Sequence, residues 1–145
     1  MSWNNIPDDE RLHLWKNLRK DISKLTLAEQ MNAVAKFFST IPYGSRSMDY
    51  YTPTEWPTPW EIIFHGKLCK SSISLLIFHT FSLLNEENTI ELQLIDDGED
   101  EYLLPIINNT FVLNYELGQV NKSQDIAAEI QVLNTYTQKD IKAIK

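Results

Sequence analysis

Apolar residues recur every three to four positions in the first part of the chain, which is the spacing of amphipathic helices. The first run predicts a helix over residues 8–25, with the inward positions Leu12, Trp15, Leu18, Ile22 and Leu25. A second run starts at Thr26. Thr26 and Glu29 have the spacing of a capping box, in which each side chain accepts the backbone N–H of the other. We expect this helix to end near Ser39 and to bury Leu27, Met31, Val34 and Phe38.

The middle of the chain combines an irregular segment with two further helices. Residues 40–57 hold several prolines and a glycine, which exclude a long regular element. The run Thr58-Pro-Trp-Glu61 has an N-cap, a proline at the first helical position and a capping-box glutamate, and Gly66 ends the short helix that it opens. Over residues 69–84 the apolar positions cover nearly the whole circumference, which predicts a buried central helix.

After Asn85 the pattern changes to an alternation with a period of two, which indicates strands. We expect them at residues 89–95, 102–107, 110–116 and 129–137. The pair Asn108-Asn109 is typical of a two-residue hairpin loop, because asparagine tolerates a positive φ. Pro105 favours a sheet edge or a bulge there. Gly118 and Asn121 interrupt the pattern, and the last residues, 138–145, predict a short helical turn.

Helices followed by an antiparallel sheet predict an α+β fold, in one domain over residues 1–145. The apolar fraction of 43% and the 16 aromatic residues (Trp 4, Tyr 6, Phe 6) exclude a disordered chain. The net charge of −7 argues against a nucleic-acid partner. The most apolar run, residues 73–84, is too short to cross a bilayer, and the first residues lack the features of a signal peptide, so we expect no membrane association and a cytoplasmic protein.

Cys69 is the residue with the clearest chemical potential. It is the single cysteine, and it opens the predicted central helix, whose N-terminus favours an anion such as the reactive thiolate. Lys67 and Lys70 lie close in the sequence and would support the thiolate. The structural alternative is a small buried cysteine without a chemical role.

A nucleophilic cysteine also needs a base, usually a histidine held by a third group. His79 lies ten residues along the same helix, roughly 15 Å away. His65 lies between two helices and could approach Cys69, although a role as the C-terminal cap of the short helix is favoured. His13 is expected on the surface.

The sequence predicts neither a metal site nor a cofactor. His and carboxylate residues do not occur at metal-ligand spacing, and four glycines form no phosphate-binding loop. The acidic run at residues 96–101 could hold a cation, but a solvated turn is the favoured interpretation because it lacks the spacing of a calcium loop.

Several blocks resemble the bacterial transglutaminase-like cysteine proteinases. The most specific is Trp56-Pro-Thr-Pro59-Trp-Glu61-Ile, then Gly66-Lys-Leu-Cys69, then a long apolar helix. The earlier run Met31-Asn-Ala-Val34-Ala-Lys-Phe37-Phe38, followed by Ile41-Pro-Tyr43 and Asp49-Tyr50, is similar to the segment that precedes this block in the family. Phe111-Val-Leu-Asn114-Tyr-Glu and the stretch from Gln124 to Tyr136 match its later strands more loosely. The resemblance covers about residues 27–137.

The resemblance implies a papain-like fold, in which a helix that carries the nucleophile packs on an antiparallel sheet. It assigns Cys69 to the nucleophile and Asn114 to the residue that orients the base. The base position falls on Glu101 or Tyr102, where the family has histidine. Loss of a general base costs about 10²–10⁴ in rate. We therefore expect a non-catalytic member.

The leading functional hypothesis is a binding or structural module that joins other protein subunits. Its expected interface is aromatic: Tyr43, Tyr50, Tyr51, Trp56 and Trp60. The alternative for this loop is a lid packed on the core. A bacteriophage tail or baseplate is the specific candidate assembly, which would place the chain in a virion. The competing hypotheses are an active thiol peptidase, amidase or acyltransferase that uses Cys69 with a relocated base such as His65, and a decoy that competes for a peptidase's substrate.

Overall fold

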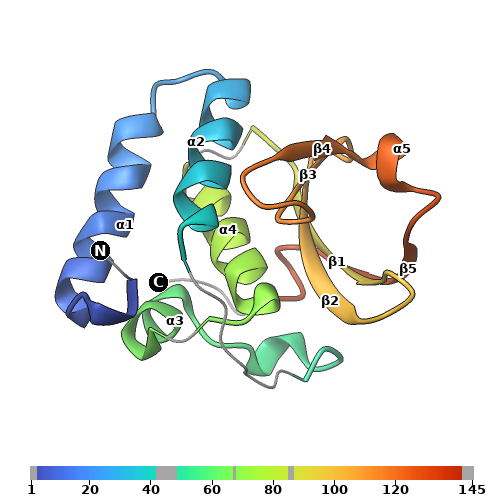
Figure 1. Ribbon diagram of the computed structural model, residues 1–145, viewed down its shortest axis with the longest axis horizontal. Helices are drawn as coiled ribbons and strands as arrows, with labels where there is room; N and C mark the ends of the chain where they lie inside the picture. The colour runs from blue at the N-terminus through green and yellow to red at the C-terminus, as the bar shows by residue number, and fades with distance from the viewer. Residues whose placement is uncertain (1–2, 42–48, 67, 85–86, 142–145) are drawn as a thin grey trace.

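A computed structural model describes residues 3–41, 49–66, 68–84 and 87–141 of the chain. Its four longest helices gather on one side and its strands on the other (Figure 1). The principal helices are α1 (Asp8–Ile22), α2 (Leu27–Ser39), α3 (Pro59–His65) and α4 (Lys70–Leu84). Two short 3-10 helices, η1 (Trp3–Asn5) and η2 (Pro53–Glu55), and the four-residue helix α5 (Ser123–Ile126) complete the helical elements of the described residues.

Five strands form one antiparallel sheet in the order β4-β3-β2-β1-β5. They are β1 (Ile90–Asp96), β2 (Glu101–Ile107), β3 (Phe111–Leu113), β4 (Val120–Lys122) and β5 (Gln131–Tyr136). The α+β prediction is therefore confirmed. Asn108 and Asn109 form the expected loop between β2 and β3, with φ values of 53° and 55°.

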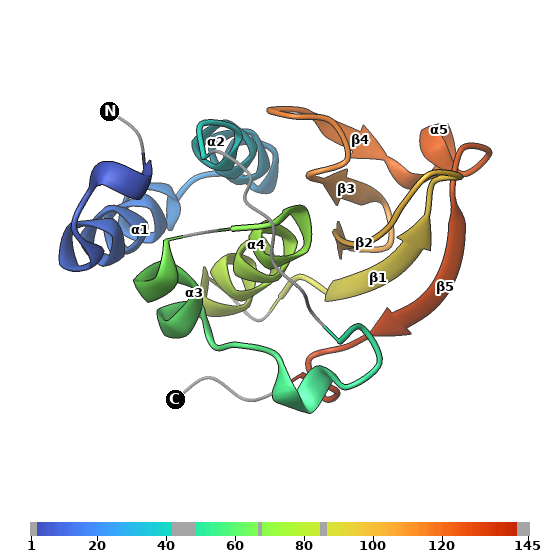
Figure 2. The ribbon, with the colours of Figure 1, turned by 60° about the horizontal axis from the view of Figure 1, so that its bottom comes forward.

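Helix α4 is the centre of the molecule. It lies between α1, α2 and α3 on one side and the sheet on the other (Figure 2). Every residue from Ser71 to Phe81 is buried, which confirms the prediction of a helix that is apolar nearly all round. The main core joins α1, α2, α3 and α4 to the face of the sheet that carries Leu92, Leu94 and Leu103. A smaller core on the opposite face includes Ile126 of α5.

The helix ends follow the caps read from the sequence. Thr26 Oγ1 accepts the N–H of Glu29 at 3.3 Å, and Glu29 Oε1 accepts the N–H of Thr26 at 3.2 Å. Thr58 and Glu61 repeat this box at the same two distances. Gly66 ends α3 in the left-handed conformation, with φ of 74°. Helix α1 ends at Ile22, three residues earlier than expected.

The end of the chain departs from the expectations. Asn121 does not interrupt the pattern, because it belongs to β4, which pairs with β3, and α5 follows at once. Residues 138–141 form a turn instead of a helix, and residues 142–145 lie outside the described part. These elements have three or four residues, too few for a hydrophobic period to show.

Pro105 lies in β2, which has a neighbouring strand on each side. It pairs with Leu92 of β1 and is buried. On the other side, β3 pairs only with Ile106 and Ile107, so no ladder partner faces Pro105 there. The strand is therefore locally an edge at the residue that lacks an N–H.

Within the described residues, no helix has both the length and the apolar character to span a bilayer.

Candidate functional site

The thiol of Cys69 lies at the N-terminus of α4. The N–H of Ser72 points to Cys69 Sγ at 3.4 Å, and Ser72 Oγ accepts the N–H of Cys69 at 3.0 Å. The two side chains also contact each other, with 3.0 Å between Sγ and Oγ. This is the reciprocal pattern of a capping box, so Cys69 has a structural role as the cap of α4. Its side chain is only half-buried.

A cleft of about 320 Å³ opens beside Cys69. Its lining comes from the segment before α3, from the first turn of α4, and from the β1–β2 turn with the start of β2. The lining residues are Tyr50, Cys69, Lys70, Ser71, Asp97, Asp100, Glu101 and Tyr102. The described residues thus place both candidates for the base position, Glu101 and Tyr102, in the same cleft as the cysteine. They place no histidine there.

Tyr102 is fixed in the cleft by a hydrogen bond to Asp97 and by the ammonium of Lys70 over its ring. Its hydroxyl donates to Asp97 Oδ2 at 3.0 Å. Burial raises the pKa of Tyr102, and the hydrogen bond to Asp97 raises it further. The N–H groups of Asp100 and Glu99 donate to Asp97 and hold the pKa of its carboxyl below the ordinary value. Tyr102 is therefore a hydrogen-bond donor fixed in the wall and cannot serve as a base near neutral pH.

Lys70 lines the cleft beside Tyr102. Its ammonium is 4.6 Å from the centroid of the Tyr102 ring and donates to the backbone oxygen of Tyr115 at 3.2 Å. Burial lowers the pKa of Lys70. The cation is thus engaged by Tyr102 and by the backbone of Tyr115. Lys67, the other lysine named in support of a thiolate, lies outside the described residues.

Asn114 anchors the first turn of α4. It follows β3 and has a φ of 67°. Its Nδ2 donates to the backbone oxygen of Lys70 at 2.9 Å and to Ser74 Oγ at 2.8 Å. The residue that the resemblance assigned to orienting a base therefore has hydrogen bonds that hold a helix to the sheet.

The three histidines lie away from this cleft. His65 is exposed and lines a separate, smaller hollow with Trp60 and Phe64. It does not cap α3 as expected, because Arg11 takes that role: its Nε and Nη2 donate to the backbone oxygens of Ile63 and Phe64, both at 2.8 Å. His79 is buried in α4, and burial lowers its pKa to about 4. His13 is exposed on α1, as predicted.

Comparison with solved structures places this arrangement in a known fold. LapG from Legionella pneumophila superimposes with a TM-score of 0.71 at 15% identity, over 90% of this chain and 76% of that chain. Its calcium-bound form gives a TM-score of 0.67 at 13% identity, over 92% and 81%. LapG is a bacterial transglutaminase-like cysteine protease.

The chain has the transglutaminase-like fold. This confirms the fold that the resemblance implied, and at such low identity it shows the fold alone. No family model and no curated protein sequence matches the chain.

Calcium is bound in one of the LapG structures, which raises the question of a calcium site here. Among the described residues no group of three or more His, Cys, Asp or Glu side chains could hold a metal ion. In the acidic turn, Asp97 Oδ1 accepts hydrogen bonds from the backbone N–H groups of Glu99 and Asp100.

The aromatic residues predicted to form an interface lie in different environments. Trp56 is only 4% exposed and packs edge-on against Tyr136, so this part of the loop is packed on the core. Trp60 is half-buried against Trp15. Tyr50 lines the cleft, and Tyr51 is 66% exposed. Tyr43 lies outside the described residues.

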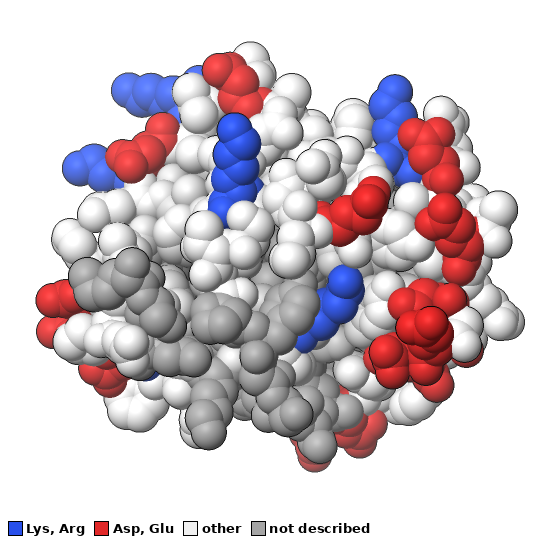
Figure 3. All heavy atoms as spheres, in the orientation of Figure 1, with Lys and Arg blue, Asp and Glu red and all other residues white. Residues whose placement is uncertain are grey.

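A second hollow, of about 580 Å³, continues from the cleft and was not foreseen from the sequence. Lys70, Asp97 and Tyr102 line both. The remaining wall is mostly acidic and polar: Tyr115, Glu116, Asn121, Asp125, Ile126 and Glu129. Acidic side chains gather over the sheet side of the molecule (Figure 3). The acidic residues that follow residue 115 were the available signal, but only the fold shows that they line a hollow next to the cysteine's cleft.

Proposed function

We propose that the chain is a non-catalytic binding module, which holds a segment of another protein in the cleft beside Cys69 without cleaving it. The observation that carries this proposal is the lining of the cleft. At the base position the described residues offer the carboxylate of Glu101 and the hydroxyl of Tyr102, and no imidazole. The missing base alone lowers a thiol enzyme's rate by about 10²–10⁴.

The remaining members of the site support the same conclusion. Cys69 and Ser72 cap α4 through each other's N–H groups. Asn114 donates to Lys70 and Ser74 of that helix. The side chains that would form a catalytic set are thus each bonded in a way that stabilises the scaffold, and the cleft between them stays open.

The chemistry of the walls favours a basic ligand. Asp97, Asp100 and Glu101 face the cleft, and Glu116, Asp125 and Glu129 face the adjoining hollow. Carboxylates pair with Lys or Arg side chains, whose methylene groups can lie along tyrosine rings such as that of Tyr50. We therefore propose a polypeptide segment rich in Lys and Arg as the bound partner.

Peptide binding tests this function directly. Fluorescence anisotropy is measured with an unstructured Lys/Arg-rich peptide and with a matched Asp/Glu-rich peptide, and mass spectrometry checks whether each is intact after incubation. We expect only the basic peptide to bind, to stay intact, and to bind equally to Cys69→Ala. Glu101→Gln should weaken binding, whereas Glu10→Gln, at an exposed position of α1, should not. Absence of binding would contradict the proposal.

An active thiol peptidase is the second candidate, and one observation favours it. The half-buried thiol faces a cleft from the N-terminus of a 15-residue helix, where the N–H of Ser72 points at the sulfur. A helix N-terminus stabilises an anion. Cleavage of the basic peptide by the wild-type chain, abolished in Cys69→Ala, would establish this candidate instead. His65 is not in the lining of the cleft, so Glu101 is the group that would have to act as base.

We further propose that the partner belongs to a larger protein assembly, with a bacteriophage tail or baseplate as the specific candidate, which would place the chain in a virion. Large exposed aromatic side chains support a protein interface: Tyr51 and Phe64 are each 66% exposed. The test is co-sedimentation of the purified chain with purified particles from its source. A chain that stays monomeric and does not sediment with them would contradict this assembly.

A further inference from the structure

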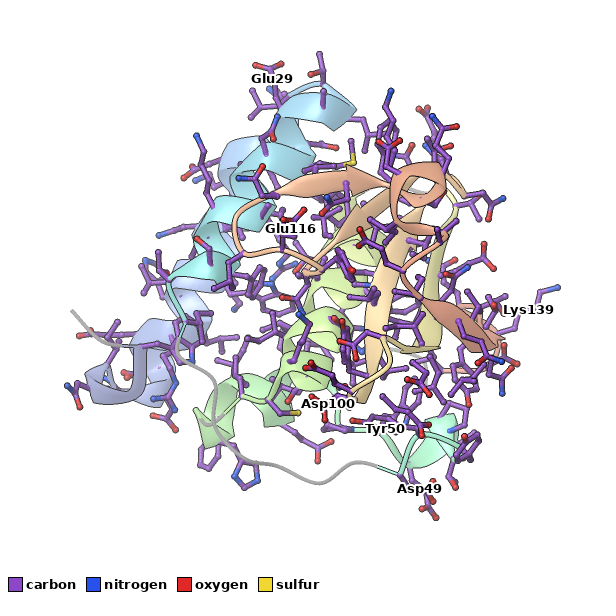
Figure 4. The ribbon with its side chains drawn as sticks, turned by 45° about the vertical axis from the view of Figure 1, so that its right-hand side comes forward. Glu29, Asp49, Tyr50, Asp100, Glu116 and Lys139 are labelled. Carbon is purple, nitrogen blue, oxygen red and sulfur yellow. The ribbon has the colours of Figure 1, made fainter. Side chains whose placement is uncertain are left out.

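We infer that Tyr50 sets the size of what reaches Cys69, and that the aromatic segment (residues 49–56) holds Tyr50 in this position. The inference deepens the proposed function, since it concerns the selectivity of the same cleft. Tyr50 lines the cleft together with Cys69. Figure 4 shows Tyr50 on the same side of the molecule as Asp100, with Asp49 directed outward.

The hydroxyl of Tyr50 is fixed close to the cysteine. Ser71, two residues after Cys69, donates its hydroxyl to Tyr50 Oη at 3.2 Å. Ser71 Oγ in turn accepts the N–H of Leu103 in β2 at 3.1 Å. A buried serine thus connects Tyr50 to both α4 and the sheet. The ring of Tyr50 therefore forms a wall between the thiol and the solvent on this side.

The backbone of Tyr50 is held from the far end of the sheet. Tyr136, the last residue of β5, donates its hydroxyl to the backbone oxygen of Tyr50 at 2.5 Å. The ring of Tyr136 packs edge-on against Trp56, with 5.0 Å between centroids, and Trp56 Nε1 donates to the backbone oxygen of Asp49 at 2.7 Å. Side-chain contacts to single backbone groups hold this segment, in which η2 is the only regular element.

Because such contacts hold the segment, a substitution at Tyr50 can widen the cleft and leave the sheet intact. The segment joins no strand of the sheet, so removal of the Tyr50 ring opens the cleft without breaking a ladder. The neighbouring Tyr51 is 66% exposed and does not line the cleft. It therefore offers a control variant with the same change of residue one position away.

Alkylation of Cys69, the single cysteine of the chain, measures access without needing a ligand. Rates are compared for a small reagent, iodoacetamide, and a bulky one, a fluorescein maleimide. In Tyr50→Ala we expect the rate with the maleimide to rise about tenfold and the rate with iodoacetamide by less than about threefold, because reactivity follows exposure of the thiolate. Tyr50→Phe keeps the ring but loses the hydrogen bond from Ser71, so its rate with the maleimide should lie between those of the wild type and Tyr50→Ala. Tyr51→Ala should behave as the wild type.

Two outcomes would overturn the inference. Equal acceleration of both reagents in Tyr50→Ala would show general loosening, and no acceleration would show that Tyr50 is not the wall. Tyr50→Leu, a milder truncation, replaces Tyr50→Ala if circular dichroism shows that the latter does not fold, and it should give the same selective rise. A chain that binds no basic peptide but shows the size-selective rise would refute the proposed function and leave this inference standing.

Discussion

A β-carbon at Gly66 would lie 2.9 Å from Cζ of Arg11, so the guanidinium occupies the space that any side chain at position 66 would need. Arg11 is 6% exposed and donates three hydrogen bonds to backbone oxygens, those of Ile6, Ile63 and Phe64. It thereby ties the N-terminal segment to the end of α3. The turn at Gly66 directly precedes the stretch that leads to Cys69, so this contact helps to place the cysteine.

Replacement of Gly66 should reveal this contact in the free energy of unfolding. Gly66→Ala has to adopt a φ of 74° and displace Arg11, and Gly98→Ala has to adopt a φ of 96° in open space. A left-handed conformation costs a non-glycine residue about 1–2 kcal/mol. We expect that loss at Gly98 and about 1 kcal/mol or more beyond it at Gly66. Urea denaturation measures both, and equal losses would mean that Arg11 yields without cost.

Removal of the guanidinium should destabilise the chain more strongly. Arg11→Met leaves three backbone oxygens without their donor, and each buried polar group without a partner costs about 1–3 kcal/mol. We expect a loss of about 3–5 kcal/mol, partly recovered in Arg11→Lys, which restores the charge without the planar fork. Lys20→Met, at an exposed position of α1, is the control and should change stability by less than about 0.5 kcal/mol. A loss in Arg11→Met as small as that of the control would refute the capping role.

Loss of the amide donor of Asn114 should lower the free energy of unfolding, although the positive φ of the residue is kept. Asn114→Asp replaces the donor to the backbone oxygen of Lys70 with an acceptor, and the two oxygens then face each other. We expect a loss of about 1–3 kcal/mol at neutral pH. Asn109→Asp is a matched control, because Asn109 has a similar φ of 55° and is exposed. Denaturation curves compare the two variants, and a neutral Asn114→Asp would contradict the anchoring role.

His79 should make stability depend on pH. Its folded-state pKa of about 4 lies below the ordinary value of 6.5, so the unfolded chain binds the proton more tightly. This contribution to stability is fully present above pH 6.5 and is lost as the pH falls through 4. Its size is roughly 3 kcal/mol, from about 1.4 kcal/mol for each pH unit between the two values.

Replacement of His79 by leucine should remove that dependence. We expect the unfolding free energy of His79→Leu to decline much less than that of the wild type between pH 6.5 and 4, with carboxylates such as Asp97 accounting for the remainder. His13→Gln, at an exposed position of α1, should keep the decline. Urea denaturation at several pH values provides the comparison, and an unchanged slope in His79→Leu would assign the decline to other groups.

The local signals in the sequence were sufficient for most of the scaffold. Thr26 with Glu29, and Thr58 with Glu61, marked two helix starts, because a capping box depends on residues only three apart. The strands β1 and β2 and the Asn108-Asn109 loop followed from alternation and turn chemistry. Short elements such as β4 and α5 were missed, since three or four residues carry no measurable period.

The contacts that define the site could not be read in this way. Arg11 and Ile63 are 52 residues apart, and Tyr136 and Tyr50 are 86 apart. No spacing along the chain indicates such pairs, so the cap of α3 was assigned to His65, the nearest suitable residue. The family resemblance assigned Cys69 to the nucleophile position and Glu101 or Tyr102 to the base position of one site. It gave no indication that Asn114 would donate hydrogen bonds to α4 or that Tyr50 would line the cleft.

The burial of α4 divides this helix into a body and a tip. Ser72 to Phe81 are buried and do not line the cleft, whereas Cys69 and Lys70, at the start of the helix, are half-buried beside it. The groups that face them across the cleft come from a turn and from the first residues of β2. Wall residues that neither cap nor anchor α4, such as Tyr50 and Glu101, can therefore be exchanged one at a time while the packed body keeps its shape. The same separation makes the scaffold suitable for engineering, since new side chains at the rim meet a cleft that is already built.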